Sequence, residues 1–117
     1  VAGFSFGAWV CMQLLMRRPE LDGFISVSPP ANKYDFSFLA PCPVSGLVLQ
    51  GRKDEIVPQD SVHKLTNQLS AQRGLHIDYR VLEEADHFFS NEIPELTAHV
   101  RSYLEMALNP IQKAANA

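Results

Sequence analysis

A serine lies between two glycines near the start of the sequence, in the segment Gly3-Phe4-Ser5-Phe6-Gly7. The segment matches the pattern G-x-S-x-G, in which a sharp strand-to-helix turn exposes a nucleophilic serine hydroxyl above a sheet. We expect glycine on both sides because larger side chains would collide where the strand and the helix approach each other. The backbone N–H of Phe6 would face a developing oxyanion, and the helix N-terminus would add partial positive charge. The alternative is a tight turn that carries no chemistry.

An acidic side chain follows a later apolar strand. Asp54 stands in residues 51–58, directly after an expected strand that ends at Gln50. Functional groups of parallel sheets lie just beyond the carboxyl ends of the strands. We therefore predict that Asp54 is the acid of a catalytic triad. Asp is also common in turns, and Glu55 is a competing carboxylate.

A histidine follows the next expected strand, in the segment Ala85-Asp86-His87-Phe88-Phe89. We predict that His87 is the general base, because it lies at the carboxyl end of a strand between apolar residues that restrict solvent. Its neighbour Asp86 is interpreted as a loop residue, since adjacent side chains rarely point at one another. The other histidines fall on expected helices or at the start of a strand: His63, His76 and His99.

Ser5, Asp54 and His87 follow one another in that order, each at the carboxyl end of a separate expected strand. This arrangement predicts acyl transfer to water. His87 takes the proton of Ser5, Asp54 orients His87, and the acyl-enzyme is then hydrolysed. No metal and no cofactor are expected, because Cys11 and Cys42 are isolated cysteines.

The elements that must position these residues alternate between strand and helix. The first helix is apolar nearly all round, so we expect it to be buried, with Cys11 as a core thiol. The last strand alternates between apolar and polar residues, as a sheet edge does. The expected elements are a strand end at 1–3, a helix at 7–17, a strand at 24–28, a loop at 29–43, a strand at 44–50, a helix at 59–72, a strand at 76–82, and a final helix capped by Asn91.

Strands that alternate with amphipathic helices predict an α/β fold, with a parallel sheet covered by helices on both faces. A sheet that starts in mid-strand leaves an apolar edge unpaired, so we expect further strands before Val1. Residues 1–117 are then the C-terminal portion of a single domain, with 109–117 as a frayed tail. We expect this portion alone to be inactive, and its open edge predicts self-association, including a homo-oligomer.

Composition narrows the range of partners. Of the 117 residues 46% are hydrophobic, and the net charge is -3. There is no basic block, so nucleic acid is not an expected partner. No apolar run reaches the roughly 18 residues that span a bilayer, so a membrane is not expected either. Two isolated cysteines fit a reducing, cytoplasmic compartment.

At these residues the sequence resembles the α/β-hydrolase superfamily, whose triad follows the chain order Ser, Asp, His. More narrowly, it is similar to small bacterial hydrolases close to the dienelactone hydrolases and the lidless carboxylesterases. The resembling pieces extend over most of the chain: Gly3-Phe4-Ser5-Phe6-Gly7-Ala8, Ser28-Pro29-Pro30, Tyr34-Asp35-Phe36, residues 51–58, and Ala85-Asp86-His87-Phe88-Phe89.

The resemblance implies a serine hydrolase that acts on small-molecule esters or thioesters. Dienelactone hydrolases proper carry Cys as the nucleophile, so Ser5 favours an esterase. Many related peptidases have a second glycine after the serine turn, and Ala8 in that place disfavours a peptidase. The family takes its second oxyanion N–H from a loop in the N-terminal half, so the resemblance implies that this donor comes from residues before Val1.

Lids in this superfamily commonly follow the strand that here ends at Ser28. Residues 29–43 are too few for a lid domain, so the resemblance implies an open site. Two other functions stay open at this point: a ligand-binding protein that keeps the fold without turnover, and an acyltransferase that uses the same triad. Several phenylalanines are candidates for an acyl pocket and for the core alike: Phe4, Phe6, Phe36, Phe88 and Phe89.

Overall fold

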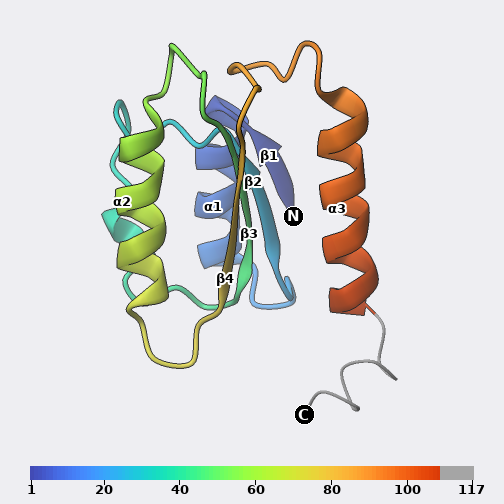
Figure 1. The fold of residues 1–117 in the computed structure, drawn as a ribbon. Coiled ribbons are helices and arrows are strands. Elements are labelled where there is room, and N and C mark those ends of the chain that lie inside the picture. Colours follow the sequence, from blue (N-terminus) through green and yellow to red (C-terminus); the bar gives the residue numbers. More distant parts are fainter. Residues whose placement is uncertain (109–117) are drawn as a thin grey trace.

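The computed structural model describes residues 1–108, and their central feature is a parallel four-stranded sheet (Figure 1). The strands lie in the order β1-β2-β3-β4, so each strand pairs with its neighbour in the sequence. The predicted α/β fold with a parallel sheet is confirmed. The tail predicted at 109–117 lies outside the described residues. The strands are β1 (Ala2–Phe4), β2 (Phe24–Val27), β3 (Gly46–Gly51) and β4 (Ile77–Leu82).

Helices cover both faces of the sheet (Figure 1). Helices α1 (Phe6–Arg17) and α2 (Gln59–Ser70) lie on one face, and α3 (Ile93–Leu108) lies on the other. A short 3-10 helix, η1 (Ser37–Leu39), interrupts the loop that was expected at 29–43. Among the described residues, no helix is long and apolar enough to cross a membrane.

Two apolar clusters, one on each face, hold the helices to the sheet. Every residue of β3 is buried, because this strand lies inside the sheet and is covered from both sides. β4 forms an edge of the sheet, as its alternating sequence predicted. The first cluster includes Met12, Leu15, Phe24, Val48, Val62, Leu65 and Leu69, and the second includes Leu47, Leu49, Leu82, Ala85 and Phe89.

The prediction that α1 is buried all round is wrong for the described chain. Met12 and Leu15 face the sheet, but Val10, Leu14 and Met16 are each at least 40% exposed. The reason is geometric, because α1 contacts the sheet on one side and no described element covers its other side (Figure 1). Cys11 is accordingly half-buried, and it is not the core thiol that the sequence suggested.

Parallel strands bring their carboxyl ends to one edge of the sheet. The segments after β1, β3 and β4 therefore meet there, at the top of Figure 1. These segments carry Ser5, Asp54 and His87 respectively.

Candidate active site

Ser5 occupies a strained backbone position between β1 and α1. Its φ of 54° and ψ of −122° lie in a region that non-glycine residues rarely adopt, at a cost of about 1–3 kcal/mol. Two backbone hydrogen bonds hold it there: Ser5 N–H donates to Val27 O at 2.8 Å, and Ala8 N–H donates to Ser5 O at 2.8 Å. The Ser5 hydroxyl does not cap the helix, so it is available to other partners.

The two glycines that flank Ser5 differ in the space that each leaves for a side chain. A Cβ atom on Gly3 would lie 2.5 Å from the carbonyl oxygen of Gly7, which is far inside van der Waals contact. A Cβ atom on Gly7 would meet nothing within 4 Å among the described residues. The steric reason that the sequence suggested for both glycines thus holds at Gly3 and is wrong at Gly7.

This difference predicts opposite effects of two alanine substitutions on stability. Gly3→Ala should lower the free energy of unfolding by about 1–3 kcal/mol, because backbone atoms must shift to admit the methyl group. Gly7→Ala, the matched control, should leave stability unchanged or raise it by up to about 1 kcal/mol, because alanine favours a helix. Urea unfolding of both variants in the complete protein measures the effect, and equal stability of the two would contradict the crowding at Gly3.

Asp54 is buried after β3, and its carboxylate accepts hydrogen bonds on both oxygens. Oδ1 accepts the backbone N–H groups of Ile56 at 2.8 Å and Val57 at 2.7 Å. Oδ2 accepts the Gln50 amide at 3.1 Å and lies 2.7 Å from His87 Nδ1. Donors thus surround the carboxylate and fix its orientation toward His87.

His87 links the acid to the serine. Its Nδ1 faces Asp54, and its Nε2 lies 2.9 Å from Ser5 Oγ. The histidine is only 4% exposed, so little solvent competes for these bonds. Its backbone is held as well, since Ser28 Oγ donates to His87 O at 3.1 Å. The structure therefore brings Ser5, His87 and Asp54 into one continuous hydrogen-bonded line.

The rival carboxylates have other surroundings. Glu55 is exposed and has no hydrogen bond to His87. Asp86 accepts the backbone N–H and the hydroxyl of Ser90, both at 3.0 Å. The backbone hydrogen bond from Ser90 is the main cause that holds the pKa of Asp86 below its ordinary value. Asp86 therefore serves its own loop as an ionised hydrogen-bond acceptor.

Phe6 begins α1, so its N–H is one of the amide groups that a helix leaves without an intrahelical acceptor. This N–H stands directly after Ser5, at the positive end of the helix dipole. An anion that forms on a group attached to Ser5 is therefore electrostatically favoured here.

The candidate phenylalanines divide into two groups. Phe36 and Phe89 are at most 7% exposed and belong to the core. Phe4 and Phe88 pack against the His87 ring with centroids 5.3 and 5.0 Å away, yet both keep more than 40% of their surface exposed. Phe6 is also exposed. Phe4 and Phe88 thus flank His87, whereas the Phe6 ring packs on Trp9 and Tyr34.

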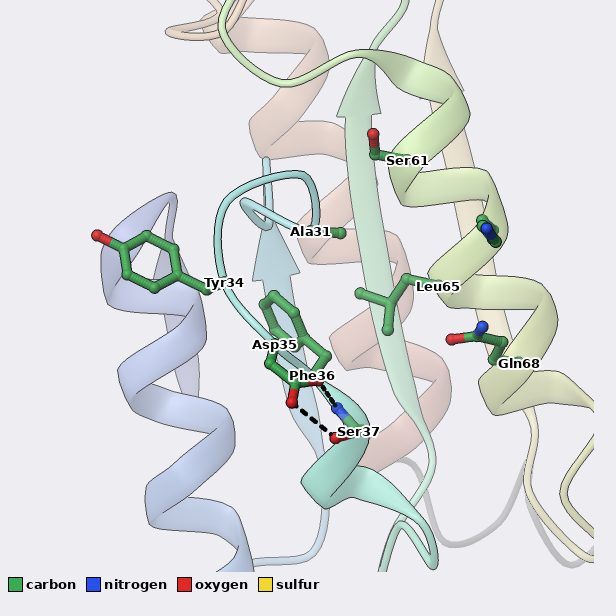
Figure 2. A pocket seen from close by; sticks show the side chains of 9 residues that line it. Ala31, Tyr34, Asp35, Phe36, Ser37, Ser61, Leu65 and Gln68 are labelled. Atoms are coloured by element: carbon green, nitrogen blue, oxygen red, sulfur yellow. Dashed lines mark hydrogen bonds between the residues drawn. The ribbon is translucent and has the colours of Figure 1, made fainter.

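A cavity of about 460 Å³ lies between the loop before η1 and helix α2 (Figure 2). Phe36 and Leu65 line it, and Ser5, Asp54 and His87 do not. Tyr34 also lines this cavity, and its ring packs on Phe6, the residue after Ser5, with centroids 5.4 Å apart. A second cavity of about 360 Å³ borders His87 and Phe88 directly.

Several residues that support this line were missed at the sequence level. Gln50 and Ser28 are fully buried, and they hold Asp54 and His87 respectively. The sequence did contain a signal for Gln50, because it is a polar residue at the end of an otherwise apolar run. The loops that carry Asp54 and His87 are also joined by two exposed ion pairs, Arg52–Glu83 and Lys53–Glu84, each worth at most about 1 kcal/mol.

The parallel sheet and its two helical layers are those of an α/β hydrolase. The sequence matches the dienelactone hydrolase family over residues 1–114, and the chain belongs to that family.

Three bacterial proteins illustrate what the chain is similar to. An uncharacterised protein of Rickettsia prowazekii is 52% identical over 108 residues, which are 89% of this chain and 45% of that protein. The crystal structure of an Agrobacterium tumefaciens protein of unknown function has a TM-score of 0.92 and 51% identity, over 93% of this chain and 50% of its own. A Xanthomonas campestris serine hydrolase without a lid has a TM-score of 0.77 and 31% identity, over 89% of this chain and 45% of its own. The chain thus spans about half the length of these relatives.

Proposed function

We propose that the complete protein containing this chain is a serine hydrolase that cleaves carboxylic ester or thioester bonds. The observation that carries the proposal is the line from Ser5 Oγ to His87 Nε2 at 2.9 Å and from His87 Nδ1 to Asp54 Oδ2 at 2.7 Å. Both distances suit proton transfer and its support by a carboxylate. Membership of a hydrolase family adds to it.

Asp54 determines which nitrogen of His87 carries the proton. Because the carboxylate accepts hydrogen bonds from Gln50 and two backbone amides, it is placed to accept a further one from His87 Nδ1–H. The other ring nitrogen, Nε2, is then unprotonated and accepts the Ser5 hydroxyl proton. This tautomer is the one that a general base requires.

The reaction proceeds in two stages. Ser5 Oγ attacks the carbonyl carbon while its proton moves to His87 Nε2, and the oxyanion forms beside the Phe6 N–H. His87 then gives the proton to the leaving alcohol or thiol, which departs and leaves an ester on Ser5. In the second stage His87 takes a proton from water, the hydroxide attacks the ester, and Ser5 recovers its proton as the acid leaves.

The surroundings of the site suggest small substrates with an apolar part. Phe4 and Phe88 present exposed rings beside His87, and Phe6, which follows Ser5 in the sequence, is exposed as well. The stretch 29–43 contains only one short helix, so it supplies no lid. We propose soluble short-chain esters or thioesters as substrates, in keeping with the cytoplasmic location inferred from two unpaired cysteines.

A substrate series tests this proposal in the complete protein. We expect steady hydrolysis of p-nitrophenyl acetate and butyrate, with a burst of nitrophenol if hydrolysis of the acyl-enzyme is slower than its formation. Aryl thioesters serve as the parallel series. A folded protein that turns over neither series and does not react with a fluorophosphonate would contradict the proposal and favour a binding function. Acyl transfer to added alcohols faster than to water would instead indicate an acyltransferase.

A further inference from the structure

The side chain of Gln50 is a polar group in a strand that is otherwise built for burial. It lies near the end of β3, its exposed fraction is 0%, and the residues before it are Leu47, Val48 and Leu49. A leucine or methionine would fill the same space without a polar group to satisfy. The presence of an amide here therefore needs an explanation beyond packing.

The neighbours of the Gln50 amide determine how it points. Its Nε2 lies within hydrogen-bond distance of Asp54 Oδ2 at 3.1 Å, Val57 O at 3.0 Å and Gly51 O at 3.3 Å. All three are acceptors, so the NH₂ group must face them. The opposite atom, Oε1, is buried and has no hydrogen-bond partner in the described chain. Such unpartnered buried atoms are rare and costly, so the amide is retained for its donors.

We propose that Gln50 is a positioning residue that holds Asp54 Oδ2 in line with His87, an inference that rests on the proposed function. Oδ1 is already held by backbone amides of its own loop. Oδ2 has only Gln50 and His87 as hydrogen-bond partners among the described residues. Gln50 stands on the rigid strand, whereas Asp54 stands on the loop after it. The amide thus fixes the carboxylate before His87 acquires its positive charge.

The hydrogen bond from Gln50 also stabilises the negative charge on Oδ2. Its loss changes the interaction between Asp54 and His87, so we expect the acidic limb of the kcat/KM profile to move from its parental position.

The first test is Gln50→Met in the complete protein, which keeps the length of the side chain and removes its donors. We expect kcat to fall about 10- to 100-fold with KM little changed, the size of loss seen when a partner that orients a functional group is removed. The acidic limb of the kcat/KM profile should differ from that of the parent protein. The downfield proton NMR resonance of the His87 Nδ1–H should shift or broaden, which a merely structural role would not predict.

Gln72→Met is the matched control. The Gln72 amide also makes partly buried hydrogen bonds, donating to Leu39 O at 2.7 Å and accepting from Cys42 N–H at 2.7 Å, but neither bond reaches the site. This variant can lose stability, yet it should keep the parental pH profile and the parental His87 resonance. The same changes in the Gln72 and Gln50 variants would show general loosening and overturn the proposal.

Gln50→Glu is the second variant, and it decides the matter if Gln50→Met does not fold. Two buried carboxyl groups at this distance share one proton rather than ionise together. While that proton is present, the new carboxyl group can donate to Asp54 as the amide does. We expect this variant to retain more activity than Gln50→Met at low pH and to gain a descending limb at high pH.

The outcomes separate this inference from the proposed function. Ser5-dependent turnover with parental kcat and pH profiles in both Gln50 variants would overturn the role of Gln50 and leave the hydrolase function intact. Absence of Ser5-dependent turnover in the parent protein would remove both.

Discussion

Replacing Ser5 with alanine lowers kcat of the complete protein by about 10³- to 10⁶-fold, if Ser5 is the nucleophile. The residual rate comes from groups that still stabilise the oxyanion, such as the Phe6 N–H, and from substrate binding. The fold should survive, because the Ser5 hydroxyl does not cap α1 and its known partner is His87. Stopped-flow and steady-state hydrolysis of p-nitrophenyl acetate measure the loss.

Ser70→Ala is the matched control for this substitution. Ser70 lies exposed at the end of α2 and makes no hydrogen bond to Ser5, Asp54 or His87, so its variant should hydrolyse esters at the parental rate. A fluorophosphonate probe should label the parent and the Ser70 variant and leave the Ser5 variant unlabelled. Parental turnover without the Ser5 hydroxyl, or labelling at another residue, would refute the nucleophile assignment.

Asp54→Asn should reduce kcat by roughly 10⁴-fold, the loss expected when a triad acid becomes a neutral amide. The amide cannot stabilise the imidazolium of His87. Its NH₂ group would also face Nδ1 and favour the tautomer in which Nε2 carries the proton. Nε2 would then be unable to accept the proton of Ser5. The pH dependence of kcat/KM in the variant measures the effect alongside the rate.

Glu55→Gln removes the same charge one residue away and serves as the control. Glu55 is exposed, and the loss of an exposed charge normally has little effect. We therefore expect Glu55→Gln to keep the parental kcat. If Glu55→Gln proved as damaging as Asp54→Asn, the acid would be misassigned. Circular dichroism of both variants establishes that they are folded.

The order of the elements could be predicted from the sequence because each element carries its own local signal. The β3 run is apolar on both faces, which indicates a covered parallel strand, and Val62, Leu65 and Leu69 mark one face of α2. Because the carboxyl ends of parallel strands lie at one edge of the sheet, Ser5, Asp54 and His87 are expected near one another. Their distances depend on the pairing of the strands, which no local pattern specifies.

Three features depended on tertiary packing and could not be predicted from local patterns. The apolar α1 was expected to be buried on all sides, but burial depends on which elements lie around it, and one side has no described neighbour. Gly7 was expected to avoid a collision that Gly3 alone avoids. Gln50 was predicted only as the last residue of a strand. Its role could not be predicted, because the sequence does not show which acceptors surround the side-chain amide.

The line from Ser5 to Asp54 is assembled from distant parts of the chain, and this affects when it can form during folding. The Ser5–His87 contact closes 82 residues, and the His87–Asp54 contact closes 33. Closing such loops costs entropy that is repaid only once the strands between them have paired. A partly folded chain therefore holds no activated serine. Reactivity toward a fluorophosphonate then becomes a reporter of the native topology, and it should disappear over the same urea concentrations as the far-ultraviolet circular dichroism.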